Sequence, residues 1–414
     1  MTLNKYSFGI GDRFAHQGKA QLQAIINARS KGVNITPVWN KSYREHTITR
    51  TSPADVRAEA DRAVGELEWT DSYYVDADHI NLENVDMFIE SSDFFTIDVA
   101  NFISKPAEPH DINDFVRKHK SLCGNLHIAG LDEPLIITED QIADTARNYL
   151  AAVKQAEKIY LHIENKKSHN NFITEISMDE TDRPQRPLEI LFILSAVADS
   201  GIPANTIAPK FIGSFYKGVD YVGDPKKFAM QFQQILAVIS YATDTFPLPK
   251  NLKLSIHSGS DKFSIYPLIN KALKKFDAGI HVKTAGTTWL EELIGLALAG
   301  PDGFAIAKKI YITAISRLDE LCAPYAAVVD IDKEKLPSPH IVNRWTGRQF
   351  ADALRHNQSC PQYNPNFRQI LHLAYKIAAE MGLDFTNALK KHEKIIAENV
   401  TKNLYHRHIK PIFM

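Results

Sequence analysis

The chain has 414 residues, a length sufficient for a large core, and its 48 basic and 49 acidic residues give a formal net charge of −1. This balance indicates neither a nucleic-acid-binding surface nor an acidic tail, so we expect a small-molecule partner. No apolar run has the length of a signal peptide or a membrane helix, which predicts a cytoplasmic protein without membrane contact. The oligomeric state stays open, a homo-oligomer included.

Strand-like runs alternate with helical patterns over the first two thirds of the chain. There are eight such runs, at 6–11, 34–40, 73–79, 94–99, 172–178, 206–211, 252–258 and 279–285. Helical spacing of apolar residues lies between them, for example over 17–31 and 186–200, and Ser52 before Pro53 is typical of a helix start. Eight strand–helix units predict an α/β fold with a TIM-type (β/α)8 barrel. An open doubly wound sheet is the alternative.

Two segments depart from this alternation. The stretch 105–167 reads as an insertion in the fourth crossover, with an extra hairpin before a long helix that starts at Glu139. From Trp289 onward only helical patterns occur, over 289–320, 343–357, 366–381 and 383–404. We therefore predict a barrel over 1–288 and a helical region over 289–414 that packs on it.

Polar residues gather where the predicted strands end, which is where barrels of this kind hold their reactive groups. His257 and His281 lie on neighbouring strands and face the same way by strict alternation, and His79 follows Asp78 on the opposite side of the barrel. Imidazoles combined with carboxylates suit zinc, manganese, nickel or iron. The pattern predicts one divalent metal ion held by His79, His257 and His281.

Carboxylates and lysines complete this set. Glu175 lies inside an apolar strand, where a carboxylate is costly unless it is paired or coordinated. Lys210 and Lys283 at strand ends either neutralise a carboxylate or hold an anionic substrate group, which the many nearby carboxylates favour. In a rival chemistry, one of them forms a Schiff base with a ketose. No dinucleotide fingerprint, P-loop or GxSxG elbow is present.

Several runs resemble the tagaturonate epimerase family over nearly the whole chain. They are SFGIGDRF, HQGKAQ, TPVWNKS, VDADHI, SMDET, IAPKF, KGVDYVGD, HSGSDKFSIYP and HVKTAGTTWLEE. The resemblance implies a metal-dependent sugar epimerase of hexuronate catabolism that interconverts tagaturonate and fructuronate, with relatives that act on the ketohexoses tagatose and fructose. It implies a metal site and an acid/base pair, for which Asp78, His79, His257 and His281 match best.

This conversion inverts a carbon that is not adjacent to the ketone, so enolisation cannot reach it. A retro-aldol route can, with a Lewis acid and carboxylates that shuttle protons. We expect Asp78 and a fifth-strand carboxylate, Glu175 or Glu180, to do so, while Lys210, Ser260, Asp261 and Lys283 bind substrate. A Schiff-base sugar aldolase and a non-catalytic sugar-acid-binding barrel are the alternatives.

Overall fold

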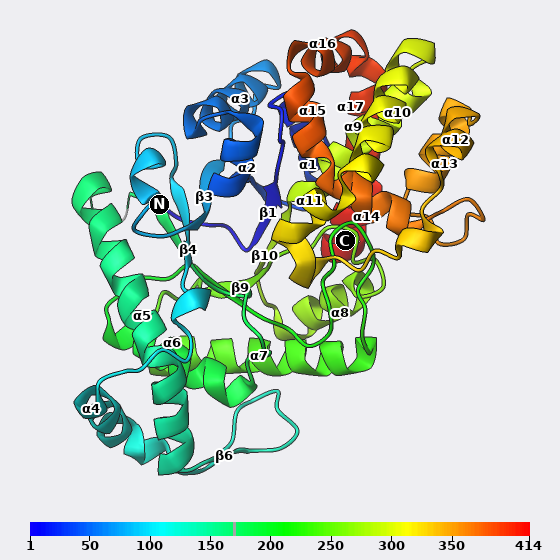
Figure 1. Cartoon of the computed structure of the whole chain (residues 1–414). Helices are drawn as coiled ribbons and strands as arrows, with labels where there is room; N and C mark the ends of the chain where they lie inside the picture. Colours follow the sequence, from blue (N-terminus) through cyan, green and yellow to red (C-terminus); the bar gives the residue numbers. More distant parts are fainter. Residues whose placement is uncertain (169–170) are drawn as a thin grey trace.

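The computed structural model describes residues 1–168 and 171–414, and its centre is a closed barrel of eight parallel strands (Figure 1). The strands neighbour one another in the order β1-β10-β9-β8-β7-β4-β3-β2. The predicted TIM-type barrel is confirmed, and each predicted strand run overlaps one barrel strand. Their bounds are β1 Tyr6–Ile10, β2 Thr36–Ser42, β3 Tyr74–Ile80, β4 Phe94–Asp98, β7 Ile173–Met178, β8 Thr206–Pro209, β9 Lys253–Ile256 and β10 Ile280–Thr284.

Apolar residues form much of the floor of the barrel interior, and most of its charged groups lie above them. A separate buried cluster fills the amino-terminal end of the strands, and it consists of Leu3, Val38, Tyr74, Phe94 and Ile173. Because side chains alternate along a strand, the next inward positions after Tyr74, Phe94 and Ile173 are Asp76, Thr96 and Glu175. The apolar cluster therefore forms a floor, and polar groups occupy the space above it.

Helices surround the barrel and cover the outward faces of its strands. Those of the strand–helix units are α1 Gly18–Arg29, α2 Tyr43–Thr49, α3 Pro53–Glu66, α6 Pro187–Asp199, α7 Pro225–Thr245 and α8 Tyr266–Phe276. The predicted start of α3 is confirmed, because Ser52 and Asp55 form a reciprocal capping box there. Short 3-10 turns are η1 Val85–Met87, η2 Ala100–Phe102, η3 Lys120–Leu122 and η5 Lys333–Lys335.

The crossover from β4 to β7 contains the predicted extra elements. After α4 Pro109–His119, the strands β5 Gly124–Leu126 and β6 Leu135–Ile137 pair as an antiparallel hairpin, and the long helix α5 Glu139–Lys167 follows. Figure 1 shows α4 and β6 projecting away from the barrel. The insertion thus lies at the periphery of the molecule.

The chain after β10 is helical, but three of its predicted helices are divided. The run 289–320 forms α9, α10 and α11. The first break lies at Gly300, which has a φ of +112° and is followed by Pro301 at the start of α10. The run 366–381 forms α14 and α15, which are separated at Ala374. The run 383–404 divides into α16, α17 and the start of a π-helix. The bounds are α9 Ala285–Leu298, α10 Pro301–Ser316, α11 Leu318–Cys322, η4 Ala323–Val328, α12 Pro339–Asn343, α13 Gly347–Leu354, α14 Pro365–Leu373, α15 Tyr375–Met381, α16 Leu383–Lys391, α17 Glu393–Lys402, η6 Asn403–Ile409 and α18 Lys410–Phe413.

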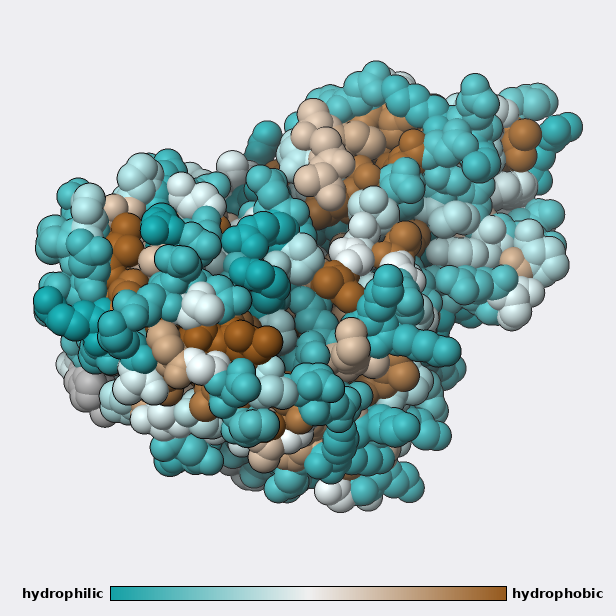
Figure 2. Space-filling view, turned by 90° about the horizontal axis from the view of Figure 1, so that it is seen from below, coloured by the Kyte–Doolittle hydropathy of each residue, from teal (hydrophilic) through white to brown (hydrophobic). Residues whose placement is uncertain are grey.

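The end of the chain packs back on the barrel. The ring of Phe413 lies 5.3 Å from that of Tyr6 and 6.0 Å from that of Phe8, both on β1. None of the helices in the described ranges is long and apolar enough to cross a membrane. Figure 2 shows a face on which hydrophilic residues predominate and apolar residues form small separate patches.

Candidate active site

The carboxyl ends of the barrel strands open into two adjoining cavities of about 350 and 360 Å³. We call them together the barrel cleft, because they share the lining residues Arg44, Asp179, Glu180, Lys217, His257, Ser258 and Tyr325. Asp78, His79 and Lys283 line one of the two cavities. The cleft thus lies over the polar layer of the barrel.

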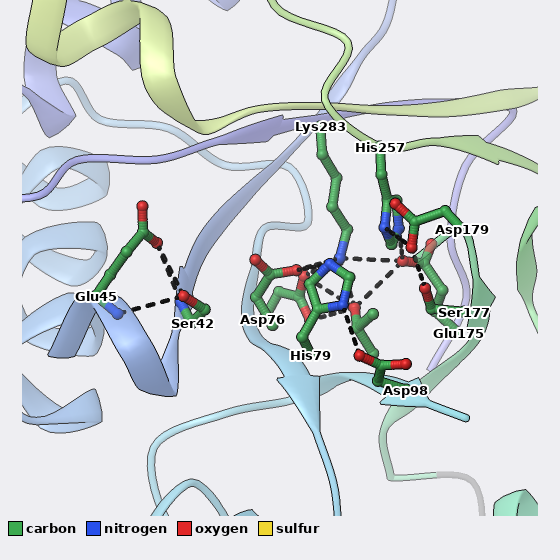
Figure 3. A network of polar contacts seen from close by, with 12 residues as sticks. Ser42, Glu45, Asp76, His79, Asp98, Glu175, Ser177, Asp179, His257 and Lys283 are labelled. Carbon is green, nitrogen blue, oxygen red and sulfur yellow. Dashed lines mark hydrogen bonds and ion pairs between the residues drawn. The ribbon is translucent and has the colours of Figure 1, made fainter. Parts of the chain in front are cut away.

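Three side chains converge at the base of the cleft: His79 at the end of β3, Asp179 after β7 and His257 after β9. One ligand atom from each lies within 4.8 Å of the others, and the two imidazole ring centroids are 4.9 Å apart. Figure 3 shows the side chains of His257 and Asp179 lying together beside that of His79. We call these three residues the triad.

Neighbouring carboxylates fix the orientation of both imidazoles. His257 Nε2 lies 2.7 Å from Glu175 Oε1, and His79 Nδ1 lies 3.2 Å from Asp98 Oδ2. The chain reaches this geometry through an unusual backbone, since His79 has a φ of +54° beside a register shift between β3 and β4. Carboxylates that bind the second ring nitrogen are typical of histidines that bind metals.

The atoms of the triad fit a bound cation. With Nε2–H donating to Glu175, the Nδ1 lone pair of His257 lies 3.2 Å from Asp179 Oδ1, and this buried Nδ1 makes no hydrogen bond in the described structure. Two lone pairs at this distance repel each other unless a proton or a metal ion lies between or beside them. Two imidazole nitrogens and one carboxylate oxygen are a donor set for zinc, manganese, nickel or iron.

Charge around the triad favours a cation as well. Burial opposes the charge on His257, but Asp179 outweighs it and raises the pKa of the imidazole to about 9. Burial likewise opposes the charge on His79, but Asp78 and Asp98 raise the pKa of this imidazole well above its usual range. The carboxylates therefore create a negative potential at the triad that positive charge must compensate.

Lys283 compensates the carboxylates of the layer below. Its Nζ lies 2.7 Å from Asp76 Oδ2, 2.7 Å from Asp78 Oδ1 and 3.0 Å from Glu175 Oε1. Burial opposes its charge, but these carboxylates hold the pKa of Lys283 well above its usual range. The ammonium is thus a fixed counter-ion between β3, β7 and β10.

The structure brings most of the predicted site residues to the cleft, but at different depths. Asp78, Glu180, Lys210 and Ser260 line it. Glu175 lies beneath the triad with no exposed surface, and its carboxylate accepts a hydrogen bond of 2.6 Å from the hydroxyl of Thr206. The side chain of Lys210 donates to the carbonyl of Thr181.

Two predicted residues lie elsewhere. His281 does not join the triad: its Nδ1 lies 2.9 Å from Ser7 Oγ, and its ring contacts Phe94 of the apolar floor. Asp261 is fully buried behind the cleft, where its carboxylate accepts a hydrogen bond of 2.8 Å from Arg368. Its environment is that of a structural ion pair between the loop after β9 and the C-terminal helices.

Other residues of the cleft could not be assigned a role from the sequence. Asp179 is the third member of the triad, and its position at a strand end was the available signal. Arg44, Lys217 and Tyr325 lie in a short helix, a loop and a 3-10 turn, respectively, whose approach to the barrel depends on the tertiary fold. No periodic pattern marks such positions.

Comparisons with known proteins agree with this architecture. A sequence profile of the family described as UxaE, tagaturonate epimerase, matches residues 1–412. A tagaturonate/fructuronate epimerase of Thermotoga maritima is 26% identical over 421 residues, which cover 97% of this chain and 80% of that protein.

Solved structures are similar over the same extent. A glycerol-complexed crystal structure of fructuronate-tagaturonate epimerase UxaE from Cohnella laeviribosi has a TM-score of 0.82 at 22% identity and covers 100% of this chain and 82% of that one. The native crystal structure of that protein has a TM-score of 0.79 at 22% identity, with 98% and 81% covered. These structures agree with this chain in fold, and the profile match over residues 1–412 shows that the chain belongs to the tagaturonate epimerase family and is a carbohydrate epimerase.

Proposed function

We propose that this chain interconverts D-tagaturonate and D-fructuronate with one divalent ion, zinc, manganese, nickel or iron, held by His79, Asp179 and His257. The observation that carries the proposal is the convergence of these three side chains within 4.8 Å at the base of the cleft. Membership of the family and the name of the Thermotoga relative support the substrate assignment.

The chemistry of the substrate explains why such a site is needed. The inverted carbon bears a hydroxyl two carbons from the ketone, so its hydrogen is not acidic. If a base removes the hydroxyl proton, the carbon–carbon bond between this carbon and its neighbour nearer the ketone breaks, leaving an aldehyde and an enediolate. The aldehyde turns its other face before the bond reforms. A bound divalent ion supplies a Lewis acid for the ketone oxygen.

Asp78 and Glu180 are the proposed proton-transfer groups. Burial opposes ionisation of Asp78, but Lys283 and the two histidines lower its pKa to about 2, so the carboxylate is charged at neutral pH and lines the cleft. Glu180 is exposed at the mouth, where it exchanges protons with solvent. Each approaches the substrate from a different strand end.

The buried groups act by positioning. Glu175 binds His257 and Lys283 and fixes the imidazole that faces Asp179. Ser260 and Lys210 line the cleft and are proposed substrate contacts.

The Schiff-base alternative is not favoured. Its nucleophile must be a neutral amine, whereas Lys283 is held protonated by three carboxylates. The Nζ atom of Lys210 is directed at the backbone carbonyl of Thr181. A barrel that only binds a sugar acid would show affinity without turnover.

The test is incubation of the purified protein with tagaturonate, and separately with tagatose, followed by NMR of the sugars. We expect fructuronate to form from tagaturonate. The proposal fails if tagaturonate is unchanged with each of the four metals added, or if a chelator that removes all bound metal leaves the rate unchanged.

A further inference from the structure

The lysine and arginine side chains of the cleft fall into two groups. Six of them line it: Arg13, Arg44, Lys210, Lys217, Lys262 and Lys283. Four of these already bind protein oxygens, as Lys210 and Lys283 do. Arg13 binds Glu45 at 3.2 Å, and Lys262 Nζ binds three backbone carbonyls at 2.8–2.9 Å. Within the described part of the chain, Lys217 and Arg44 have no ion pair and no side-chain hydrogen bond.

Lys217 and Arg44 both lie near the aromatic ring of Tyr325. Lys217 Nζ lies 5.8 Å and Arg44 Cζ 5.5 Å from the ring centroid of Tyr325. The hydroxyl of Tyr325 is 2.8 Å from that of Tyr375, and the side chain is 9% exposed, so the ring has a fixed position. All three residues line the cleft shared with the triad.

The loop that carries Lys217 is rigidly held on both sides. Its own amide donates to Val328 O at 2.9 Å, at the end of η4, the turn that carries Tyr325. Lys262 Nζ binds the carbonyls of Tyr216 and Val219, and Arg368 Nε donates to Gly218 O at 2.6 Å. A cation with a fixed backbone and free donors binds an anion at little ordering cost.

The nearby carboxylates only partly balance the charge of Lys217. Burial and repulsion from Arg13 and Arg44 outweigh the attraction of Glu180 and Glu45 and lower the pKa of Lys217. A substrate carboxylate bound by this lysine would stabilise its charged ammonium.

We propose that Lys217 and Arg44 bind the carboxylate of the uronate and thereby make the enzyme prefer a sugar acid over a neutral ketohexose. This inference rests on the proposed function. In tagaturonate the carboxylate lies two carbons beyond the inverted carbon, so after bond cleavage it stays on the aldehyde fragment. An anchor at this end retains the fragment while its reacting carbonyl turns.

The test compares tagaturonate with tagatose, which has a hydroxymethyl group in place of the carboxylate. We expect Lys217→Met to lower kcat/KM for tagaturonate by about 100-fold, mainly through KM, and to change kcat/KM for tagatose by less than about threefold. Arg44→Met has the same selective effect, and Lys217→Arg keeps most of the preference. Lys227→Met, on exposed surface at the start of α7, is the control and changes neither rate.

Other results would overturn the assignment. An equal fall in both rates means that Lys217 acts on the shared chemistry, and no fall in either means that it binds no substrate. Calorimetry separates these failures from failure of the proposed function. The wild type could bind tagaturonate without epimerising it, with this binding lost in Lys217→Met and retained in Lys227→Met. In that case the proposed function fails, but the carboxylate site stands. Equal tagaturonate binding by Lys217→Met and wild type refutes the carboxylate site.

Discussion

Replacement of Lys283 by methionine is the sharpest perturbation of the polar layer. The ammonium is the counter-ion of Asp76, Asp78 and Glu175, all within 3.0 Å and all buried. Removing one partner of such a buried group leaves uncompensated charge and costs about 3–5 kcal/mol. We therefore expect Lys283→Met to be less stable by this amount and inactive as an epimerase.

The expected change in melting temperature follows from the size of the chain. An unfolding entropy of about 2.1 cal/mol/K per residue gives roughly 0.9 kcal/mol/K for 414 residues, so Tm falls by roughly 3 to 6 °C. Scanning calorimetry at pH 7 measures the shift. Lys309→Met, on the exposed surface of α10, is the control for the same substitution outside the cleft and leaves Tm unchanged.

The pH dependence gives a second readout. Burial opposes ionisation of Asp78 and Glu175, but Lys283 holds the pKa of both carboxylates below their usual values. The stability that they contribute is present above their unfolded pKa values near 4 and is lost as the pH falls through the lower folded values. The gap between wild type and Lys283→Met therefore narrows in acid. A variant with wild-type Tm, or a gap that is independent of pH, would refute the counter-ion role.

Three further predictions concern buried groups near the triad and behind the cleft. Asp261→Asn removes the partner of buried Arg368 and costs about 3–5 kcal/mol in urea unfolding at pH 7. Because Arg368 outweighs burial and lowers the pKa of Asp261, this difference shrinks below about pH 4, and a constant difference contradicts the pair. His281→Asn retains one equivalent of metal by elemental analysis whereas His79→Ala loses it; equal loss would make His281 a ligand. Glu175→Gln weakens metal affinity 10- to 100-fold in a chelator titration, and wild-type affinity would remove its positioning role.

The strands and their inward faces could be predicted from the sequence because alternation depends only on the local chain. The same alternation could not predict how deep in the barrel each inward side chain lies. His281 and Lys283 face the interior as expected, but His281 comes two residues, about 7 Å of strand length, before Lys283 on β10 and therefore lies deeper, beside the floor. Lys283 lies at the same depth as the buried carboxylates, and its charged ammonium forms an ion pair with Asp76.

Site residues outside the strands could not be predicted from the sequence for another reason. The polar end of β7 pointed to the region of Asp179, but its pairing with His257 depends on how β7 and β9 tilt around the barrel. Lys217, Arg44 and Tyr325 come from three segments far apart in sequence, and only the closed fold brings them to one cleft. The division of 289–320 was signalled by Gly300 and Pro301.

The central claim is that the triad binds the ion on which epimerisation depends. Elemental analysis of wild type and His257→Ala, with NMR assays of tagaturonate conversion on the same samples, tests it most directly. We predict one equivalent of divalent metal in the wild type, lost together with activity in the variant, and activity restored when metal is returned to chelator-stripped wild type. Full conversion by metal-free wild type, or an active His257→Ala that retains its metal, would contradict the account.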